Sequence, residues 1–298
     1  MKTTKHCFSV AGFRLHVHMP ETWKVEMMLP SFLPFRDKGM GTDVDLLDCE
    51  AFPVSASHPM EMFGTLIEET CNDMGYIRLF TQSDGYKVTL SRKPGGALHL
   101  MQANRDFSHI RITLCENDSY LGGMLSSLLR IAYSQALLYH QAVSIHASAV
   151  YREGKAYLFM GRSGTGKSTH SALWMKYIPG TELLNDDNPT IRIMDGKAYA
   201  YGTPWSGKTP CYKPLSFLVG GMVRLQQAAE NRFIRQEGAD AFVVLYPGCS
   251  AICQDVELRT RLYDTLVRLA ESVPVGLLDC KPDEEAARLC WNELSKLN

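Results

Sequence analysis

The feature that most constrains this chain is the segment Gly161-Arg-Ser-Gly-Thr-Gly-Lys-Ser168, which matches the pattern GxxxxGK[ST] without a mismatch. An apolar, strand-like segment at 156–160 precedes it, and a helix-like segment at 168–177 follows it. In this context the glycines let successive backbone N–H groups point at phosphate oxygens, and the start of the helix attracts the same anion. The motif therefore predicts a phosphate-binding loop; the alternative is a glycine-rich turn before an ordinary helix.

The motif also predicts roles for two of its side chains. Lys167 is expected to reach the β- and γ-phosphates, and the Ser168 hydroxyl is expected to bind Mg²⁺. The implied ligands are ATP, or another nucleoside triphosphate, and Mg²⁺. The predicted nucleotide-binding residues are Gly161, Arg162, Ser163, Gly164, Thr165, Gly166, Lys167, Ser168 and Thr169.

Two adjacent carboxylates, Asp186 and Asp187, follow a short strand-like segment at 182–185. Open α/β sheets bind ligands beyond the carboxyl ends of their strands, so a strand beside the phosphate loop would end at the nucleotide. We interpret the pair as catalytic and metal-binding residues, with Ser168 as a further metal ligand; the alternative is a solvated turn. Consecutive side chains of extended backbone point in opposite directions, so we expect only one carboxylate to touch the ion directly.

His146 is a further candidate catalytic residue, because of its position in a predicted hairpin. Two strand-like segments, 143–150 and 156–160, flank Glu153-Gly154, which predicts a tight turn. In that register His146 lies opposite Gly161, near the mouth of the phosphate loop. The alternative is a hydrogen-bonded histidine in the core or at a sheet edge.

A loop after a second predicted hairpin, which turns at Asp195-Gly196, supplies candidate substrate residues. It reads Gly202-Thr-Pro-Trp-Ser-Gly-Lys208, and Trp205 and Lys208 could cover an anionic ligand. The loop could equally be a surface turn with an anchoring tryptophan. Arg224 is a weaker candidate, since a structural salt bridge is the commoner role for such an arginine.

The two parts of the chain differ in pattern, which predicts two domains. Residues 1–118 have the pattern of strands and turns, with a hairpin over Asp84-Gly85 and one helix at 59–74. Residues 119–298 begin with a long helix at 121–140 and continue with alternating short strands and helices. The expected fold class is α/β, with a strand-rich α+β N-terminal domain of unassigned role at 1–118 and a phosphate-loop domain at 119–298.

Composition excludes several classes of protein. The chain has 31 Lys and Arg against 32 Asp and Glu, and this net charge of -1 argues against a protein of nucleic acid or membrane surfaces. Its nine cysteines include no CxxC pair, which predicts free thiols in a reducing cytoplasm. Neither a signal peptide nor an apolar span of about 18 residues is recognisable, so we expect a cytoplasmic protein whose oligomeric state is open.

Three segments, in this order, carry a resemblance to a known superfamily: Ser144-Ile-His-Ala-Ser148, the phosphate loop, and Leu183-Leu-Asn-Asp-Asp187. Together they resemble the catalytic core shared by HPr kinase/phosphorylase and ATP-dependent phosphoenolpyruvate carboxykinase. The resemblance covers about residues 140–298 and implies a P-loop core of this type with ATP and Mg²⁺. It also implies that His146 belongs to the metal site, as in the carboxykinase, and that one aspartate is the base for an acceptor serine, as in HPr kinase.

The activity that the resemblance implies is ATP-dependent transfer of a γ-phosphoryl group to a hydroxyl of a small molecule or a protein serine. A carboxykinase-like phosphotransferase and a non-catalytic nucleotide-binding module are the alternatives. The loop that HPr kinase uses for phosphorolysis is not recognisable, and the chain is shorter than a full carboxykinase. The resemblance therefore does not identify the acceptor.

Overall fold

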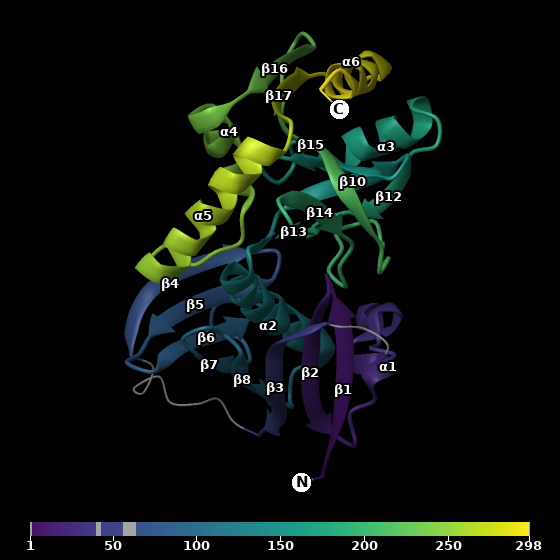
Figure 1. The fold of residues 1–298 in the computed structure, drawn as a ribbon. Helices are drawn as coiled ribbons and strands as arrows, with labels where there is room; N and C mark the ends of the chain where they lie inside the picture. The colour runs from purple at the N-terminus through teal and green to yellow at the C-terminus, as the bar shows by residue number, and fades with distance from the viewer. Residues whose placement is uncertain (1, 40–42, 56–63, 298) are drawn as a thin grey trace. The chain divides into compact units, whose positions relative to one another are not determined.

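The computed structural model describes residues 2–39, 43–55 and 64–297, and the chain forms two compact units (Figure 1). Unit 1 comprises Met1–Tyr139 and Ile252–Val256, and unit 2 comprises His140–Ala251 and Glu257–Asn298. Both units combine a large sheet with a few helices, so the expected mixed α/β class is confirmed. The division falls at Tyr139, one helix later than the expected boundary at residue 118.

Unit 1 contains a sheet of eight strands, counted over the described residues, in the order β1-β2-β3-β8-β7-β6-β5-β4. The predicted hairpin over Asp84-Gly85 is present as β5 and β6, which pair from Tyr76↔Ser91 to Thr81↔Tyr86. The strand bounds are β1 (Thr3–Val10), β2 (Phe13–Pro20), β3 (Val44–Val54), β4 (Thr65–Asn72), β5 (Gly75–Thr81), β6 (Gly85–Ser91), β7 (His99–Asn104) and β8 (His109–Cys115).

The helix predicted at 59–74 is not found in the described part of that segment. Thr65–Asn72 forms β4 instead, which is antiparallel to β5 and ends where Asn72 pairs with Gly75 across a tight turn. Two residues of the predicted helix face, Met60 and Phe63, lie outside the described residues. The prediction is wrong for β4 because pairing with a neighbouring strand outweighs an apolar spacing that also suits a helix.

Helix α2 (Leu121–Ala136) packs against β3, β6, β7 and β8 and continues into a 3₁₀ helix, Leu137–His140. Its buried residues recur three and four apart, which gives the helix one apolar face for the sheet. This packing explains why the helix belongs to unit 1. Elsewhere in the described part of unit 1, helical turns are present at α1 (Val25–Met28) and in the 3₁₀ segment Pro30–Phe35.

Unit 1 also includes a segment from late in the sequence, Ile252–Val256. The Tyr86 hydroxyl donates a hydrogen bond to Asp255 Oδ2 at 2.6 Å. The backbone N–H of Ile252 donates to Oε1 of Gln135 in α2 at 2.8 Å. These bonds tie the segment to strand β6 and helix α2, although the residues on either side of it belong to unit 2.

The main path of the sheet in unit 2 has the order β12-β10-β11-β15-β14-β13-β9, and β17 joins β15 and β16 beside it. The long strand β15 runs parallel to both β11 and β17 and antiparallel to β14, so it holds the sheet together. The strand bounds are β9 (Ala142–Ser144), β10 (Ala147–Arg152), β11 (Lys155–Met160), β12 (Glu182–Asn185), β13 (Thr190–Met194), β14 (Lys197–Tyr201), β15 (Ser216–Gln227), β16 (Arg232–Gln236) and β17 (Val275–Cys280).

The single strand predicted at 143–150 is divided in the structure. Strand β9 pairs with β13, whereas β10 pairs with β11 and β12. The chain leaves the ladder between them because the N–H of Ile145 donates to Pro189 O and the N–H of His146 donates to Gly248 O. The predicted register of β10 and β11 is confirmed up to Ala147↔Met160, the pair next to His146.

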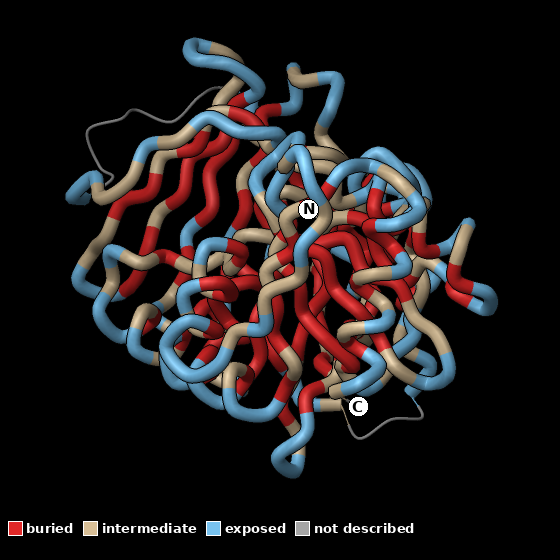
Figure 2. The backbone as a smooth tube through the Cα atoms, turned by 90° about the horizontal axis from the view of Figure 1, so that it is seen from above, coloured by how far each residue is buried: buried red, intermediate tan, exposed pale blue. Residues whose placement is uncertain are grey.

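Helices α3 and α6 contribute to the core of unit 2. Figure 2 shows runs of buried backbone in the interior and exposed backbone in the outer loops. Trp174 of α3 is fully buried, and its ring centroid lies 5.1 Å from that of Phe159. Helix α4 packs against β15, β16 and β17. The helix bounds are α3 (Lys167–Tyr177), α4 (Gly238–Leu245), α5 (Val256–Ser272) and α6 (Glu284–Ser295). None of the helices in the described part of the chain has the length and apolar character of a membrane-spanning helix.

Candidate phosphate and carboxylate site

The phosphate loop lies between β11 and α3, as the motif predicts. Gly164 and Gly166 have φ angles of 81° and 108°, in a region that favours glycine. Gly166 is the residue before the helix, and its carbonyl accepts the N–H of His170 at 2.8 Å. The loop is further held by Gln227 of β15, whose Nε2 donates to the carbonyls of Gly164 and Thr165 at 3.4 Å each. No motif in the sequence indicates this role for Gln227.

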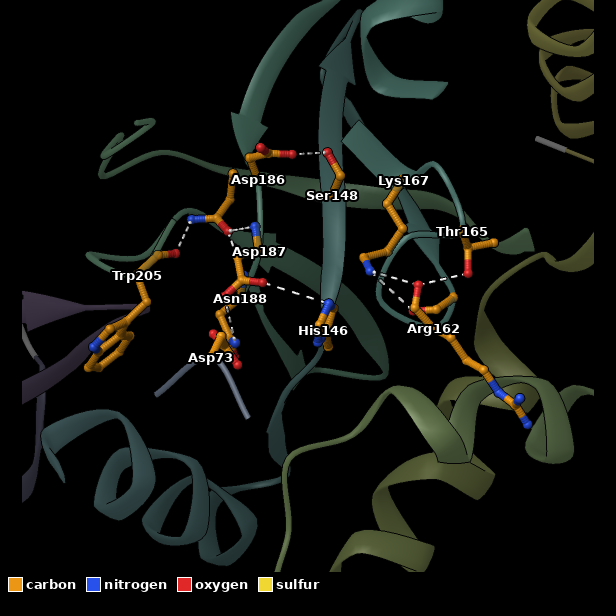
Figure 3. Close-up of polar contacts among 12 residues, drawn as sticks. Asp73, His146, Ser148, Arg162, Thr165, Lys167, Asp186, Asp187, Asn188 and Trp205 are labelled. Atoms are coloured by element: carbon orange, nitrogen blue, oxygen red, sulfur yellow. Dashed lines mark hydrogen bonds and ion pairs between the residues drawn. The ribbon is translucent and has the colours of Figure 1, made fainter. Parts of the chain in front are cut away.

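Lys167 bends back over this loop (Figure 3). Its Nζ donates to Gly161 O at 3.2 Å and to Arg162 O at 3.4 Å. Burial lowers the pKa of Lys167, and the charges of Asp187 and Asp186 oppose that shift. The ammonium group therefore lies within electrostatic reach of both carboxylates.

The two aspartates follow β12, and their side chains take different directions (Figure 3). Asp186 is 5% exposed; its Oδ1 accepts the Ser148 hydroxyl at 2.9 Å and its Oδ2 accepts the N–H of Thr209 at 3.3 Å. Asp187 Oδ1 instead lies 3.7 Å from Nε2 of His146. One carboxylate is thus directed at β10, and the other at a partly exposed imidazole.

Asn185, the residue before the aspartates, organises the surrounding backbone and was missed by the sequence analysis. Its side chain is fully buried, and Nδ2 donates to the carbonyl of Trp205 at 3.0 Å. Its Oδ1 accepts the N–H groups of Asp187 and Asn188 at 3.0 and 2.8 Å. A buried amide must find partners for its N–H groups and its oxygen. The asparagine at the end of an apolar strand is therefore the sequence feature that could have indicated this role.

The loop that contains Trp205 and Lys208 passes directly beside the aspartates. A Cβ at Gly207 would lie 2.6 Å from Asp186 O, so the approach of the two backbones requires glycine. Trp205 is 6% exposed, and its carbonyl is bound by Asn185. Lys208 is exposed. Buried Trp205 therefore fixes the loop to the protein, whereas the exposed side chain of Lys208 is accessible to a ligand.

Arg224, the weaker candidate, lies in β15, and its Nη1 donates to Val244 O at 3.5 Å. This contact is with the backbone of α4 and not with the phosphate loop. It gives Arg224 a structural contact between a strand and a helix.

The oxygen donors at the site suit Mg²⁺. Over the described residues, no group of three or more His, Cys, Asp and Glu side chains is placed to hold a metal ion. Mg²⁺ requires no such group, since it usually keeps waters and binds one or two carboxylates together with substrate phosphates. The residues that could hold the ion are Ser168, at the start of α3, and the two aspartates, whose charges oppose the effect of burial on the pKa of Lys167.

No family model matches the sequence, whereas comparisons with curated proteins and solved structures find similar proteins. A solved structure of the HPr(Ser) kinase/phosphatase from Coxiella burnetii aligns over 52% of this chain and 97% of that chain, with 12% identity and a TM-score of 0.32. The phosphoenolpyruvate carboxykinase (ATP) from Aeropyrum pernix is 30% identical over 148 residues, which make up 45% of this chain. The match spans 29% of the length of that carboxykinase. The sequence match supports the relationship that the motifs indicate, to the superfamily of HPr kinase and ATP-dependent phosphoenolpyruvate carboxykinase.

Proposed function

We propose that the protein is an ATP-dependent phosphotransferase that moves the γ-phosphoryl group to a hydroxyl of a small molecule or a protein serine. The observation that carries this proposal is the placement of Asp187 and His146, 3.7 Å apart, beside a complete phosphate loop. Phosphoryl transfer needs a cradle for the phosphates and a group that orients or deprotonates the acceptor. The loop supplies the first, and the aspartate–histidine pair supplies the second.

Each side chain has a role in this proposal. The N–H groups of the loop and Lys167 bind the phosphates, and Asp187 accepts the proton of the acceptor hydroxyl while His146 orients it. Asp186 and Ser168 hold Mg²⁺, which neutralises charge on the phosphates when it is bound. Asp186 is assigned to the metal because its carboxylate is directed at β10 and away from His146.

The test is nucleotide binding followed by turnover. Calorimetry with ATP, with and without Mg²⁺, should show binding that Mg²⁺ strengthens and that Lys167→Ala removes. Purified protein should then transfer phosphate from ATP to a hydroxyl acceptor in a panel that includes free serine, an HPr-type protein and, as the alternative substrate, oxaloacetate. Wild-type protein that binds no ATP in the presence of Mg²⁺ would falsify the proposal.

A second candidate, a carboxykinase-like phosphotransferase, is favoured by the sequence match to the Aeropyrum pernix enzyme. It predicts ATP-dependent conversion of oxaloacetate with release of carbon dioxide, whereas the first candidate predicts no reaction with oxaloacetate. The same panel separates a third candidate, a nucleotide-binding module without catalysis, which would bind ATP and transfer nothing. A cytoplasmic location, in which the free cysteines stay reduced, belongs to the same proposal.

A further inference from the structure

Two buried serine hydroxyls lie behind Asp186, and neither belongs to the phosphate-loop motif. Ser148 is in β10 and is fully buried, and Ser171 is in α3 and is 1% exposed. Their Oγ atoms are 2.6 Å apart, and Ser148 Oγ lies 2.9 Å from Asp186 Oδ1. The three side chains therefore form a continuous line from a helix, across a strand, to the carboxylate (Figure 3 shows its Ser148–Asp186 part).

Counting protons fixes the direction of this line. An ionised carboxylate can only accept, so the Ser148 proton is donated to Asp186. Ser148 has no second proton, so Ser171 must donate to Ser148 in the other bond. The order is Ser171 to Ser148 to Asp186, and Ser171 acts on the carboxylate only through Ser148.

These hydrogen bonds connect helix α3 to the end of strand β12, the two elements that carry the proposed metal ligands Ser168 and Asp186. Ser171 lies three residues after Ser168, so both are on the first turns of the helix that begins at the phosphate loop. Asp186 lies at the end of β12 and accepts the Thr209 N–H on its other oxygen. With a donor on each oxygen, the carboxylate has little freedom to rotate, and its position follows the position of α3.

We propose that Ser148 and Ser171 are positioning residues that set the Asp186 carboxylate against the phosphate loop for Mg²⁺. The proposal rests on the proposed function, because Mg²⁺ is the ion that the phosphate loop requires. Neither serine touches the nucleotide; both act through Asp186. Groups that orient a metal ligand usually change metal affinity or activity about 10–100-fold when they are removed.

The experiment compares Ser148→Thr with Ser148→Val. Threonine and valine have the same shape, so both variants strain the buried site equally, and only the first keeps a hydroxyl. ATP affinity is measured by calorimetry with and without Mg²⁺, and kcat and KM are measured with the acceptor found for the wild type. We expect Ser148→Val to lose about 10–100-fold of the Mg²⁺-dependent part of ATP affinity relative to Ser148→Thr, with equal ATP affinity in EDTA.

The same measurements on Ser171→Ala form a second part of the experiment, with Ser134→Ala as the control. Ser171→Ala should weaken the Mg²⁺ effect less than Ser148→Val does, and it should add nothing in the Ser148→Val background, since Ser171 acts only through Ser148. Ser134 is equally buried and donates to Arg130 O within α2, so its loss should affect neither arm.

Equal Mg²⁺ dependence in Ser148→Thr and Ser148→Val overturns the proposal, as does an effect of Ser171→Ala that is the same in both backgrounds. Wild-type protein that binds ATP without any Mg²⁺ dependence overturns the metal role of Asp186 and this inference together. A wild type that shows the Mg²⁺ dependence while both serine arms fail leaves the proposed function intact and rejects only the positioning role.

Discussion

Asp187 Oδ1 lies 3.7 Å from Nε2 of His146, at the point where the β10–β11 ladder has ended. The imidazole is 38% exposed, so it can face a ligand on one side while it meets the carboxylate on the other. His146→Ala should therefore lower kcat by about 10–100-fold without unfolding the protein. Turnover and thermal unfolding of the variant, beside the exposed control His109→Ala, measure this. Loss of folding together with activity would assign His146 to the core instead.

The two aspartates should respond differently to the same change. Asp187→Asn removes the proposed base and should lower turnover at least ~100-fold while Mg²⁺-dependent ATP binding persists. Asp186→Asn replaces one of the two carboxylate oxygens by an NH₂, which then faces a donor, either the Ser148 hydroxyl or the Thr209 N–H; the change should weaken Mg²⁺-dependent binding and also lower stability. Paired calorimetry and turnover measurements separate the two outcomes. Near-wild-type rates in both variants would remove the aspartates from the mechanism.

The two lysines near the site should also differ. Lys167 has its Nζ in the phosphate loop, so Lys167→Ala should abolish ATP binding or reduce turnover at least ~100-fold. Lys208 is exposed beside the aspartates, so Lys208→Ala should raise the KM of an anionic acceptor and leave ATP affinity unchanged. Steady-state kinetics with each substrate varied in turn checks both. A change in ATP affinity alone for Lys208→Ala would place this residue on the nucleotide.

Asn185→Ala should lower the free energy of unfolding by more than the loss of one hydrogen bond would. The buried amide bonds the backbone of Trp205, Asp187 and Asn188. Its removal takes one hydrogen-bond partner from each of these groups, at a cost of about 1–3 kcal/mol for each one that is left unsatisfied. Urea denaturation should show a loss of at least ~2 kcal/mol. Asn292→Ala on the exposed side of α6 is the control and should be nearly neutral. An Asn185→Ala protein as stable as wild type would mean that solvent satisfies those groups.

Acid should loosen unit 1 through His99. Its fully buried ring accepts the Cys115 N–H on Nδ1 at 3.2 Å, which needs an unprotonated nitrogen, and its Nε2 lies 3.2 Å from Asp118 Oδ2. Burial lowers the pKa of His99 below its ordinary value of 6.5, against the opposite effect of Asp118. The unfolded chain therefore binds a proton at a higher pH than the folded chain, and stability falls as the pH drops below 6.5.

Hydrogen exchange in β7 and β8 measures this effect of His99. Protection of these strands should fall as the pH is lowered through 6.5, the ordinary pKa of histidine. The fall should be smaller in His99→Gln than in wild type, while His109→Gln, at an exposed position, should behave as wild type does. An unchanged acid response in His99→Gln would assign the sensitivity to other groups.

Features that depend on neighbouring residues could be predicted from the sequence. The turns at Glu153-Gly154 and Asp195-Gly196 occur where expected, with all four residues at positive φ, and they fix two hairpins of unit 2. The break between β9 and β10 could not be predicted, because the backbone partners that cause it, Pro189 and Gly248, lie far away in the sequence. The same reason explains β4, whose strand state depends on pairing with β5.

In the candidate site, too, features set by neighbouring residues could be predicted, whereas features set by residues distant in the sequence could not. The phosphate loop is a continuous motif, so its strand, glycines and helix could all be placed in advance. Ser148 is an ordinary serine in an apolar strand until Asp186, 38 residues later, is brought to it by the pairing of β10 with β12. Asn185 gains its importance only from the return of the loop at Trp205. Motifs identify groups that bind ligands; the fold identifies the groups that hold them in place.

The return of Ile252–Val256 to unit 1 limits how this protein could be assembled from parts. The chain passes between the units at Tyr139–His140, at Ala251–Ile252 and at Val256–Glu257. A single recombination event at the first crossing would exchange unit 1 but leave this segment matched to the old one, with Ile252 and Asp255 deprived of Gln135 and Tyr86. The two units are therefore expected to be inherited together, and substitutions at Tyr86 and Asp255 to accompany one another.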